Sequence, residues 1–167
     1  NIPLYAYIRK TFKLPIKKYT LPNPQMVVIE GGKHADNSTD LQEYLISPIK
    51  GNSIKEEVRA GLEVYQELKN ILKKNKFTTN IGNEGAFAPV GMKSNEQPIK
   101  FILQAIKQAG YQQKDIGLSF DAAASEFFKK GKYVLKKERK KLTSKQVLKY
   151  FSSWIKNRDL PRIGFLY

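Results

Sequence analysis

Four short apolar runs bounded by glycine, proline or asparagine predict the strands of this chain. They cover residues 26–29, 44–48 and 116–120, and a last run over residues 161–167 indicates a strand that is cut short. Apolar runs of this length between turn-forming residues are typical of buried strands. Because residues 30–43 join the first two strands without a predicted helix, we expect these two strands to pair antiparallel.

Apolar residues at intervals of three and four predict three long helices and one short one. The first long helix begins at Ser53, which forms a capping box with Glu56; the second is expected to be capped by Asn95, and the third begins at Thr143. The residues expected on the apolar faces of the long helices are Ile54, Val58, Leu62, Tyr65, Leu68 and Leu72, then Ile99, Ile102, Leu103 and Ile106, then Val147, Phe151, Trp154 and Ile155. A short amphipathic helix is expected to contain Leu4, Tyr5, Tyr7 and Ile8.

The predicted order of elements is two strands, two helices, a strand, a helix and a truncated strand, which indicates an α/β fold. The pair Lys130-Gly131 between two aromatic and apolar runs also predicts a tight hairpin. Residues 1–23 contain three prolines and are expected to be a linker or the tail of a preceding domain. Residues 24–167 are then the domain proper.

Composition narrows the class of protein. The chain has 167 residues, of which 41% are hydrophobic, with nine Phe and nine Tyr, and this excludes a disordered chain. It has no cysteine, which excludes a disulfide framework and a thiolate metal site and fits a reducing, cytoplasmic setting. No apolar run approaches the length of a membrane span, and the first residues do not form a signal peptide.

The net charge of +15 raises the possibility of an anionic partner. A basic nucleic-acid-binding module is therefore one alternative function. The cations are mostly lysines spread along the whole chain, however, and the one dense run is at residues 136–141. Such a run is usually a solvated face, and we expect that here.

Chain connectivity predicts that five polar residues share one edge of the sheet. If the first strand ends at an upper edge, the loop with His34 lies there, and the second strand starts there with Gln42 and Glu43. The next helix brings the loop with Glu84 back to this edge, and the third strand rises to end at Asp121. Active sites of α/β sheets and barrels lie at the carboxyl ends of parallel strands.

The residue types at this edge suit a particular chemistry. Several carboxylates can bind a hard divalent cation through oxygen, and Mg²⁺ is the expected ion. Carboxylates that share a pocket also push each other's pKa values apart, which suits one of them for general acid work, and a histidine can donate to an anionic substrate. Plainer roles stay open: Asp121 could cap a turn, Glu84 could be a solvated loop carboxylate, and His34 could be structural.

With these residues in view, the sequence resembles the enolase (phosphopyruvate hydratase) family along almost its whole length. The matching segments are residues 1–5, 31–37, 42–43, 53–65, 82–85, 87–89, 93–96, 121, 124–127 and 131–133. The resemblance implies a barrel of the TIM type that opens with strand, strand, helix, helix. It also implies a lyase of glycolysis that reversibly dehydrates 2-phosphoglycerate to phosphoenolpyruvate.

The resemblance also implies roles for single residues. Glu84 matches the general acid that helps to expel the hydroxyl group, and Asp121 matches a ligand of Mg²⁺, the expected cofactor. His34, Gln42 and Glu43 match residues that contact the substrate or assist the acid, so His34 and Glu43 are candidate catalytic residues too. The expected partners of the full-length parent are its substrate and a second copy in a homodimer, or further copies in an octamer, with no membrane and no nucleic acid.

The chain departs from the family pattern at several of these places. It has Glu30 where the family usually has Asn, Asn83 where it usually has Asp, and Ala86 where it usually has Gly. Asn83 removes a charge beside the expected acid. By register, Leu166 and Tyr167 stand where the family has a Glu-Asp pair that includes a second metal ligand.

These departures and the length lead us to expect an incomplete barrel. A complete barrel of this type needs roughly 250 residues, so we expect residues 24–167 to form its first half. The catalytic lysine and the remaining metal ligands are expected outside this sequence, and we predict that the isolated chain is an inactive fragment. The alternatives are a non-catalytic enolase-like scaffold and the basic nucleic-acid-binding module.

Overall fold

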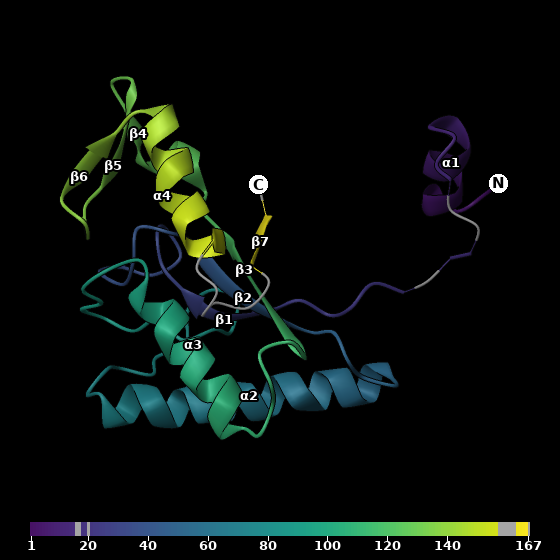
Figure 1. Ribbon diagram of the computed structural model, residues 1–167, viewed down its shortest axis with the longest axis horizontal. Helices are drawn as coiled ribbons and strands as arrows, with labels where there is room; N and C mark the ends of the chain where they lie inside the picture. The colour runs from purple at the N-terminus through teal and green to yellow at the C-terminus, as the bar shows by residue number, and fades with distance from the viewer. Residues whose placement is uncertain (16–17, 20, 157–162, 167) are drawn as a thin grey trace.

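The computed structural model describes residues 1–15, 18–19, 21–156 and 163–166, and a four-stranded open sheet is its main feature (Figure 1). The strands are β1 (Met26–Glu30), β2 (Glu43–Pro48), β3 (Ile116–Asp121) and β7 (Ile163–Leu166), in the order β1-β2-β3-β7. The prediction of all four is confirmed, although Pro161, Arg162 and Tyr167 of the last run lie outside the described residues.

The directions of these strands decide where the polar residues lie. β2 pairs antiparallel with both β1 and β3, and β7 pairs parallel with β3. The carboxyl ends of β1 and β3 therefore lie at the edge of the sheet where β2 begins. This is the arrangement that connectivity predicted.

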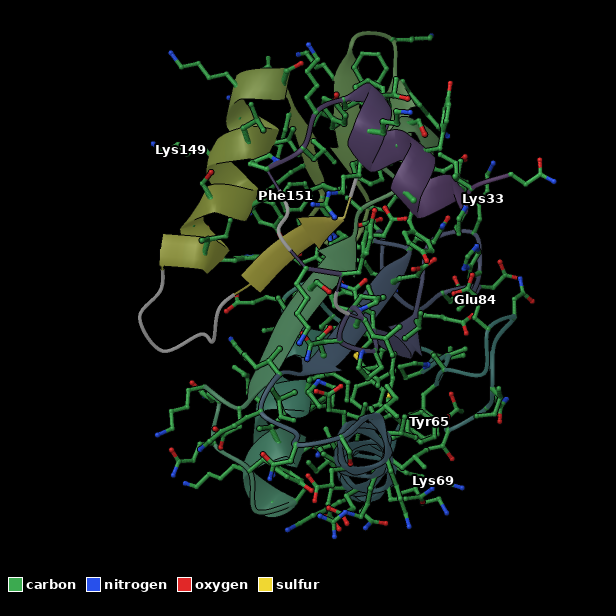
Figure 2. All side chains as sticks on the ribbon, turned by 90° about the vertical axis from the view of Figure 1, so that its right-hand side faces the viewer. Lys33, Tyr65, Lys69, Glu84, Lys149 and Phe151 are labelled. Atoms are coloured by element: carbon green, nitrogen blue, oxygen red, sulfur yellow. The ribbon has the colours of Figure 1, made fainter. Side chains whose placement is uncertain are left out.

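The long helices α2 (Ile54–Lys74) and α3 (Gln97–Gln108) pack against each other, and α2 also packs against β2 (Figure 1). The helix α4 (Ser144–Lys156) contacts the sheet through Phe151 and Trp154, whose rings lie 5.5 Å and 5.3 Å from the ring of Phe120. Figure 2 shows the two sides of α4, with Phe151 toward the sheet and Lys149 away from it. The core that results is lined by Ile29, Ile46, Val64, Leu68, Phe87, Ile99, Ile102 and Phe120.

The expected apolar face of α2 was partly wrong. Ile54, Val58 and Leu62 are exposed, whereas the helix buries the neighbouring face, whose residues are Ala60, Gly61, Val64, Leu68, Ile71 and Leu72. Gly61 lies against the side chain of Met26, which a Cβ at this position would overlap. A search for large apolar residues at helical spacing does not register the small residues Ala60 and Gly61 on this face. Ile155 of α4 is also exposed, against expectation.

The starts of two helices agree with the sequence, and one does not. The Ser53 hydroxyl accepts the N–H of Glu56, although the Glu56 carboxylate accepts from Asn52 and not from Ser53. Thr143 and Gln146 form the reciprocal bonds of a capping box. The expected cap of α3 was wrong, because the N-cap position is Glu96 and Asn95 is fully buried elsewhere.

A second sheet, which is antiparallel, is formed by the residues that follow β3 and precede α4 in the chain. A 3₁₀ turn (Ala124–Phe127) leads into β4 (Phe128–Lys129), β5 (Lys132–Leu135) and β6 (Lys140–Leu142). The predicted hairpin is confirmed, since Lys130 and Gly131 both have positive φ, as a type I′ turn requires. β6 was not predicted, because it falls in the basic run. Exposure of that run is confirmed for Lys136, Arg139, Lys140 and Lys141.

The amino-terminal residues form the short helix α1 (Leu4–Thr11), as expected. It buries none of its residues, and Figure 1 shows it apart from the two sheets. The boundary near residue 23 stays a prediction. Within the described part of the chain, the helices are too short or too polar to cross a membrane.

Candidate active site

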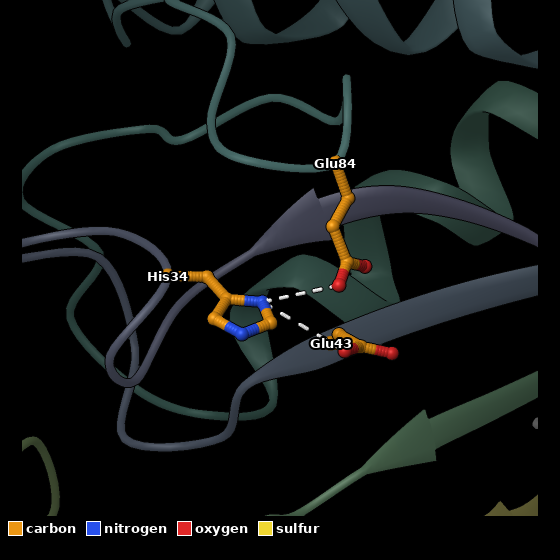
Figure 3. Close-up of side chains that lie close together, drawn as sticks. All are labelled: His34, Glu43 and Glu84. Carbon is orange, nitrogen blue, oxygen red and sulfur yellow. Dashed lines mark ion pairs between the residues drawn. The ribbon is translucent and has the colours of Figure 1, made fainter.

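The polar residues expected at one edge of the sheet do meet there. Glu43 at the start of β2 is in register with Glu30 at the end of β1 on one side and with Asp121 at the end of β3 on the other. The loop between β1 and β2 brings His34 to this edge, and the loop between α2 and α3 brings Glu84 (Figure 3). Three segments far apart in sequence thus contribute to one cluster.

The centre of the cluster is the imidazole of His34. Its Nδ1 lies 3.7 Å from a carboxylate oxygen of Glu43 and 3.7 Å from one of Glu84 (Figure 3). These distances are too long for hydrogen bonds, and Nδ1 is a buried atom without a hydrogen-bond partner among the described residues. Catalytic hydrogen bonds are often this loose before a substrate tightens them.

Negative charge is concentrated around Glu43. Burial raises the pKa of Glu43 above its ordinary value, and the charges of Glu84 and Asp121 raise it further. A hydrogen bond from the Gln42 side chain and the neighbouring His34 act in the opposite direction. The net effect is that Glu43 retains a proton at a higher pH than an exposed glutamate.

Asp121 has a structural bond and also faces the cluster. One of its oxygens accepts the N–H of Ala123 at 2.8 Å, so it does cap a turn. Ala123 has a φ of 44°, which is uncommon for a residue with a side chain. The backbone carbonyl of Asp121 accepts the N–H of Gln42, which fixes the start of β2 against the end of β3.

The loop that carries His34 is tightly folded. Gly31 donates to the carbonyl of Gln42 and accepts from the N–H of His34 at 2.9 Å. A Cβ at Gly31 would overlap the side chain of Thr39, so only glycine allows the loop to close this way.

Asp40 and Asn95 hold this loop in place, a role that the sequence did not indicate for either residue. The Asp40 carboxylate accepts the N–H groups of Lys136 at 3.0 Å and Lys137 at 2.9 Å, and it also accepts from the side chain of Asn95 at 3.0 Å. The Asn95 side chain in return accepts the N–H of Asp40 at 2.8 Å. The loop is thus tied to α3 and to the second sheet. The run of Asp and Asn residues in the loop was the available signal, since such side chains often bond to backbone.

The backbone of Asn95 extends the same network. Its N–H donates to the Glu138 carboxylate at 2.8 Å, and its carbonyl accepts the hydroxyl of the buried Tyr44 at 2.8 Å. Burial raises the pKa of Tyr44, which keeps it a neutral donor. Glu138 is the one acidic residue of the basic run, and its role here explains why it is turned inward.

The donor atoms at this edge fit a hard cation. Glu43, Glu84 and Asp121 offer carboxylate oxygens. The ligand atoms of His34, Glu43 and Glu84 lie within 4.8 Å of one another, and the imidazole is the one basic group among these three side chains. A positive ion would relieve the repulsion from Glu84 and Asp121, which adds to the effect of burial on the pKa of Glu43. Oxygen ligands of this kind suit Mg²⁺ better than a transition metal.

Comparison with known proteins identifies relatives over most of the chain. Residues 18–163 match the family described as enolase, C-terminal TIM barrel domain. The enolase of Elusimicrobium minutum is 46% identical over 163 residues, which are 98% of this chain and 37% of that protein. The enolase of Wolinella succinogenes is 46% identical over 157 residues, which are 93% of this chain and 36% of that protein. The chain therefore spans a little over a third of the length of these curated relatives.

Proposed function

This chain belongs to the enolase family, and on that premise we propose that it supplies the acid side of a site that reversibly dehydrates 2-phosphoglycerate to phosphoenolpyruvate. The observation that carries the proposal is the convergence of His34, Glu43 and Glu84. A turn with only a structural role would not require two carboxylates and the single histidine of the chain to lie together.

Each residue has a proposed task in this reaction. Expulsion of a hydroxyl group requires a proton on the leaving oxygen, and Glu84, whose side chain is 40% exposed, is placed where a substrate could receive one. Glu43 is more buried and has a raised pKa, so it can hold a proton and assist the acid. His34 and Gln42 contact the substrate and orient it.

Asp121 is the residue that would hold Mg²⁺. When bound, the ion would offset the negative charge that develops on the substrate carboxylate. Leu166 is in parallel register with Asp121 on β7, and leucine has no ligand atom. The other ligands of the ion, and the lysine that removes the substrate proton, are therefore assigned outside these 167 residues, and we propose that the isolated polypeptide does not turn over. By analogy with the family, we place the whole protein in the cytoplasm as a homodimer or octamer.

A chimera tests the proposal. Residues 18–163 would replace the matching segment of the Wolinella succinogenes enolase, and phosphoenolpyruvate formation would be followed by absorbance. We expect the chimera to be active, and Glu84→Gln in it to lower kcat by roughly 10²- to 10⁴-fold. Glu67→Gln, which alters a partly exposed carboxylate on α2, is the matched control and should leave kcat unchanged. An active Glu84→Gln chimera would contradict the role of Glu84.

The second candidate is a non-catalytic enolase-like scaffold. Leu166 favours it, because a ligand position beside Asp121 lacks a carboxylate. A second chimera, in which the replaced segment extends to residue 166, separates the two candidates. The scaffold candidate predicts that this chimera folds without activity and that Leu166→Glu does not restore it. The isolated 167-residue chain should form no phosphoenolpyruvate under either candidate.

A further inference from the structure

Glu30, the last residue of β1, is a buried carboxylate that binds the loop of Glu84. Its side chain is 0% exposed. One of its oxygens accepts the N–H of Asn83 at 2.8 Å, and the other accepts those of Glu84 at 2.9 Å and Ala86 at 3.1 Å. Three N–H groups of one loop thus donate to a single side chain.

Among the described residues, the Glu30 carboxylate is compensated by backbone N–H groups and not by a cation. Within the described part of the chain, Glu30 takes part in no ion pair with Lys, Arg or His. A buried carboxylate is costly unless it is paired or fully hydrogen-bonded, and bonds from N–H groups to a carboxylate are stronger than neutral ones. If the loop left this position, the buried carboxylate would lose its three hydrogen-bond donors.

The shape of the loop follows the carboxylate. A Cβ at Gly82 would overlap the Glu30 carboxylate, so the loop passes as close as a backbone can. From the other side, the Tyr65 hydroxyl donates to the carbonyl of Gly85 at 2.7 Å, and its ring stacks on Phe87 at 4.2 Å. Figure 2 shows Tyr65 on α2 below Glu84. The segment is therefore clamped between a strand and a helix.

We infer that Glu30 is the positioning residue of Glu84: its carboxylate fixes the loop backbone so that the Glu84 side chain lies 3.7 Å from His34. The role of Glu84 as an acid rests on the proposed function, but its placement by Glu30 does not. A competing explanation is that backbone bonds alone fix the loop, since Glu30 N–H donates to the Phe87 carbonyl and Phe87 N–H donates to Val28. The two explanations differ in what the Glu30 side chain contributes.

The single histidine of the chain makes the test direct. NMR spectra of the 167-residue chain would be recorded for the unaltered protein and for Glu84→Gln, which defines how the His34 ring signals move when the neighbouring carboxylate is lost. Glu30→Ala should move the same signals in the same direction, although Glu84 is still present. Exchange of the amides of Asn83, Glu84 and Ala86 should accelerate by roughly tenfold or more.

Two further variants separate positioning from general loss of stability. Asp115→Asn alters a largely buried carboxylate at the opposite end of β3, where it accepts the N–H of Gln112, and it should lower the melting temperature without moving the His34 signals. Glu30→Gln keeps one acceptor oxygen, so faster exchange is expected either for the Asn83 amide alone or for the Glu84 and Ala86 amides alone. This variant tests the positioning role if Glu30→Ala does not fold.

Unchanged His34 signals and unchanged exchange in a folded Glu30 variant would overturn the inference. Because no substrate or metal enters this experiment, its result is independent of whether Glu84 acts as an acid. The chimera decides that separate question.

Discussion

Replacing Asn95 by alanine tests whether the network around the His34 loop stabilises the fold. The change removes the bond from the Asp40 N–H, worth about 1 kcal/mol, and the bond to the Asp40 carboxylate, worth about 2 kcal/mol, because bonds to charged groups are stronger. The donor–acceptor distances of these two hydrogen bonds are 2.8 Å and 3.0 Å. Because Asn95 is 0% exposed, water cannot replace the bonds without rearrangement. We therefore expect a loss of about 3 kcal/mol in the free energy of unfolding.

For a chain of this length, a loss of that size lowers the melting temperature by roughly 6–12 °C. The assay is urea and thermal unfolding followed by circular dichroism. Asn70→Ala is the matched control, because Asn70 is exposed on α2 and donates only to Glu67, and it should change stability by less than about 0.5 kcal/mol. A loss below about 1 kcal/mol for Asn95→Ala would refute the reasoning, since the two bonds would then contribute little beyond what solvent supplies.

Three further predictions concern the edge of the sheet. Burial and negative neighbours raise the pKa of Glu43 above 4.5, so the folded state binds this proton more readily than the unfolded state. The free energy of unfolding therefore falls as the pH rises above 4.5 and Glu43 loses its proton. Glu43→Gln should therefore be more stable than the unaltered chain at pH 7 but not at pH 4 in urea titrations, and a difference independent of pH would contradict this. Leu166→Glu puts a carboxylate in register with Asp121 and should tighten Mg²⁺ binding about tenfold in calorimetry, while unchanged binding would argue against Asp121 as a ligand. Gly82→Ala should cost about 1–3 kcal/mol by displacing Glu30, whereas Gly117→Ala, which meets only ordinary contacts, should cost less in the same melts.

Chain connectivity was enough to predict the edge where the cluster forms. Once β1, β2 and β3 were located from their apolar runs, alternation of direction decided which loops lie together, and no side-chain detail was needed. The closeness of His34, Glu43 and Glu84 follows from that topology. Their chemical roles are not settled by it and stay predictions.

Features that depend on small or polar residues were not predictable in the same way. The buried face of α2 includes Ala60 and Gly61, which hydrophobic periodicity does not weigh, because neither has a large apolar side chain. Asn95 satisfied every local rule for a helix cap, yet its partner Asp40 is 55 residues away in sequence. Local propensity cannot anticipate a competing partner that only the tertiary fold brings near.

The departures at Glu30 and Asn83 illustrate the same limit, and the structure relates them to each other. Considered one at a time, Glu30 adds a buried charge to β1, and Asn83 removes one beside the expected acid. The N–H of Asn83 donates to the Glu30 carboxylate at 2.8 Å, so both residues belong to one contact. An aspartate at position 83 would add a third carboxylate to a segment that already contains Glu84 and contacts Glu30, whereas an asparagine adds none. The uncharged residue in the loop is therefore suited to the charged residue on the strand.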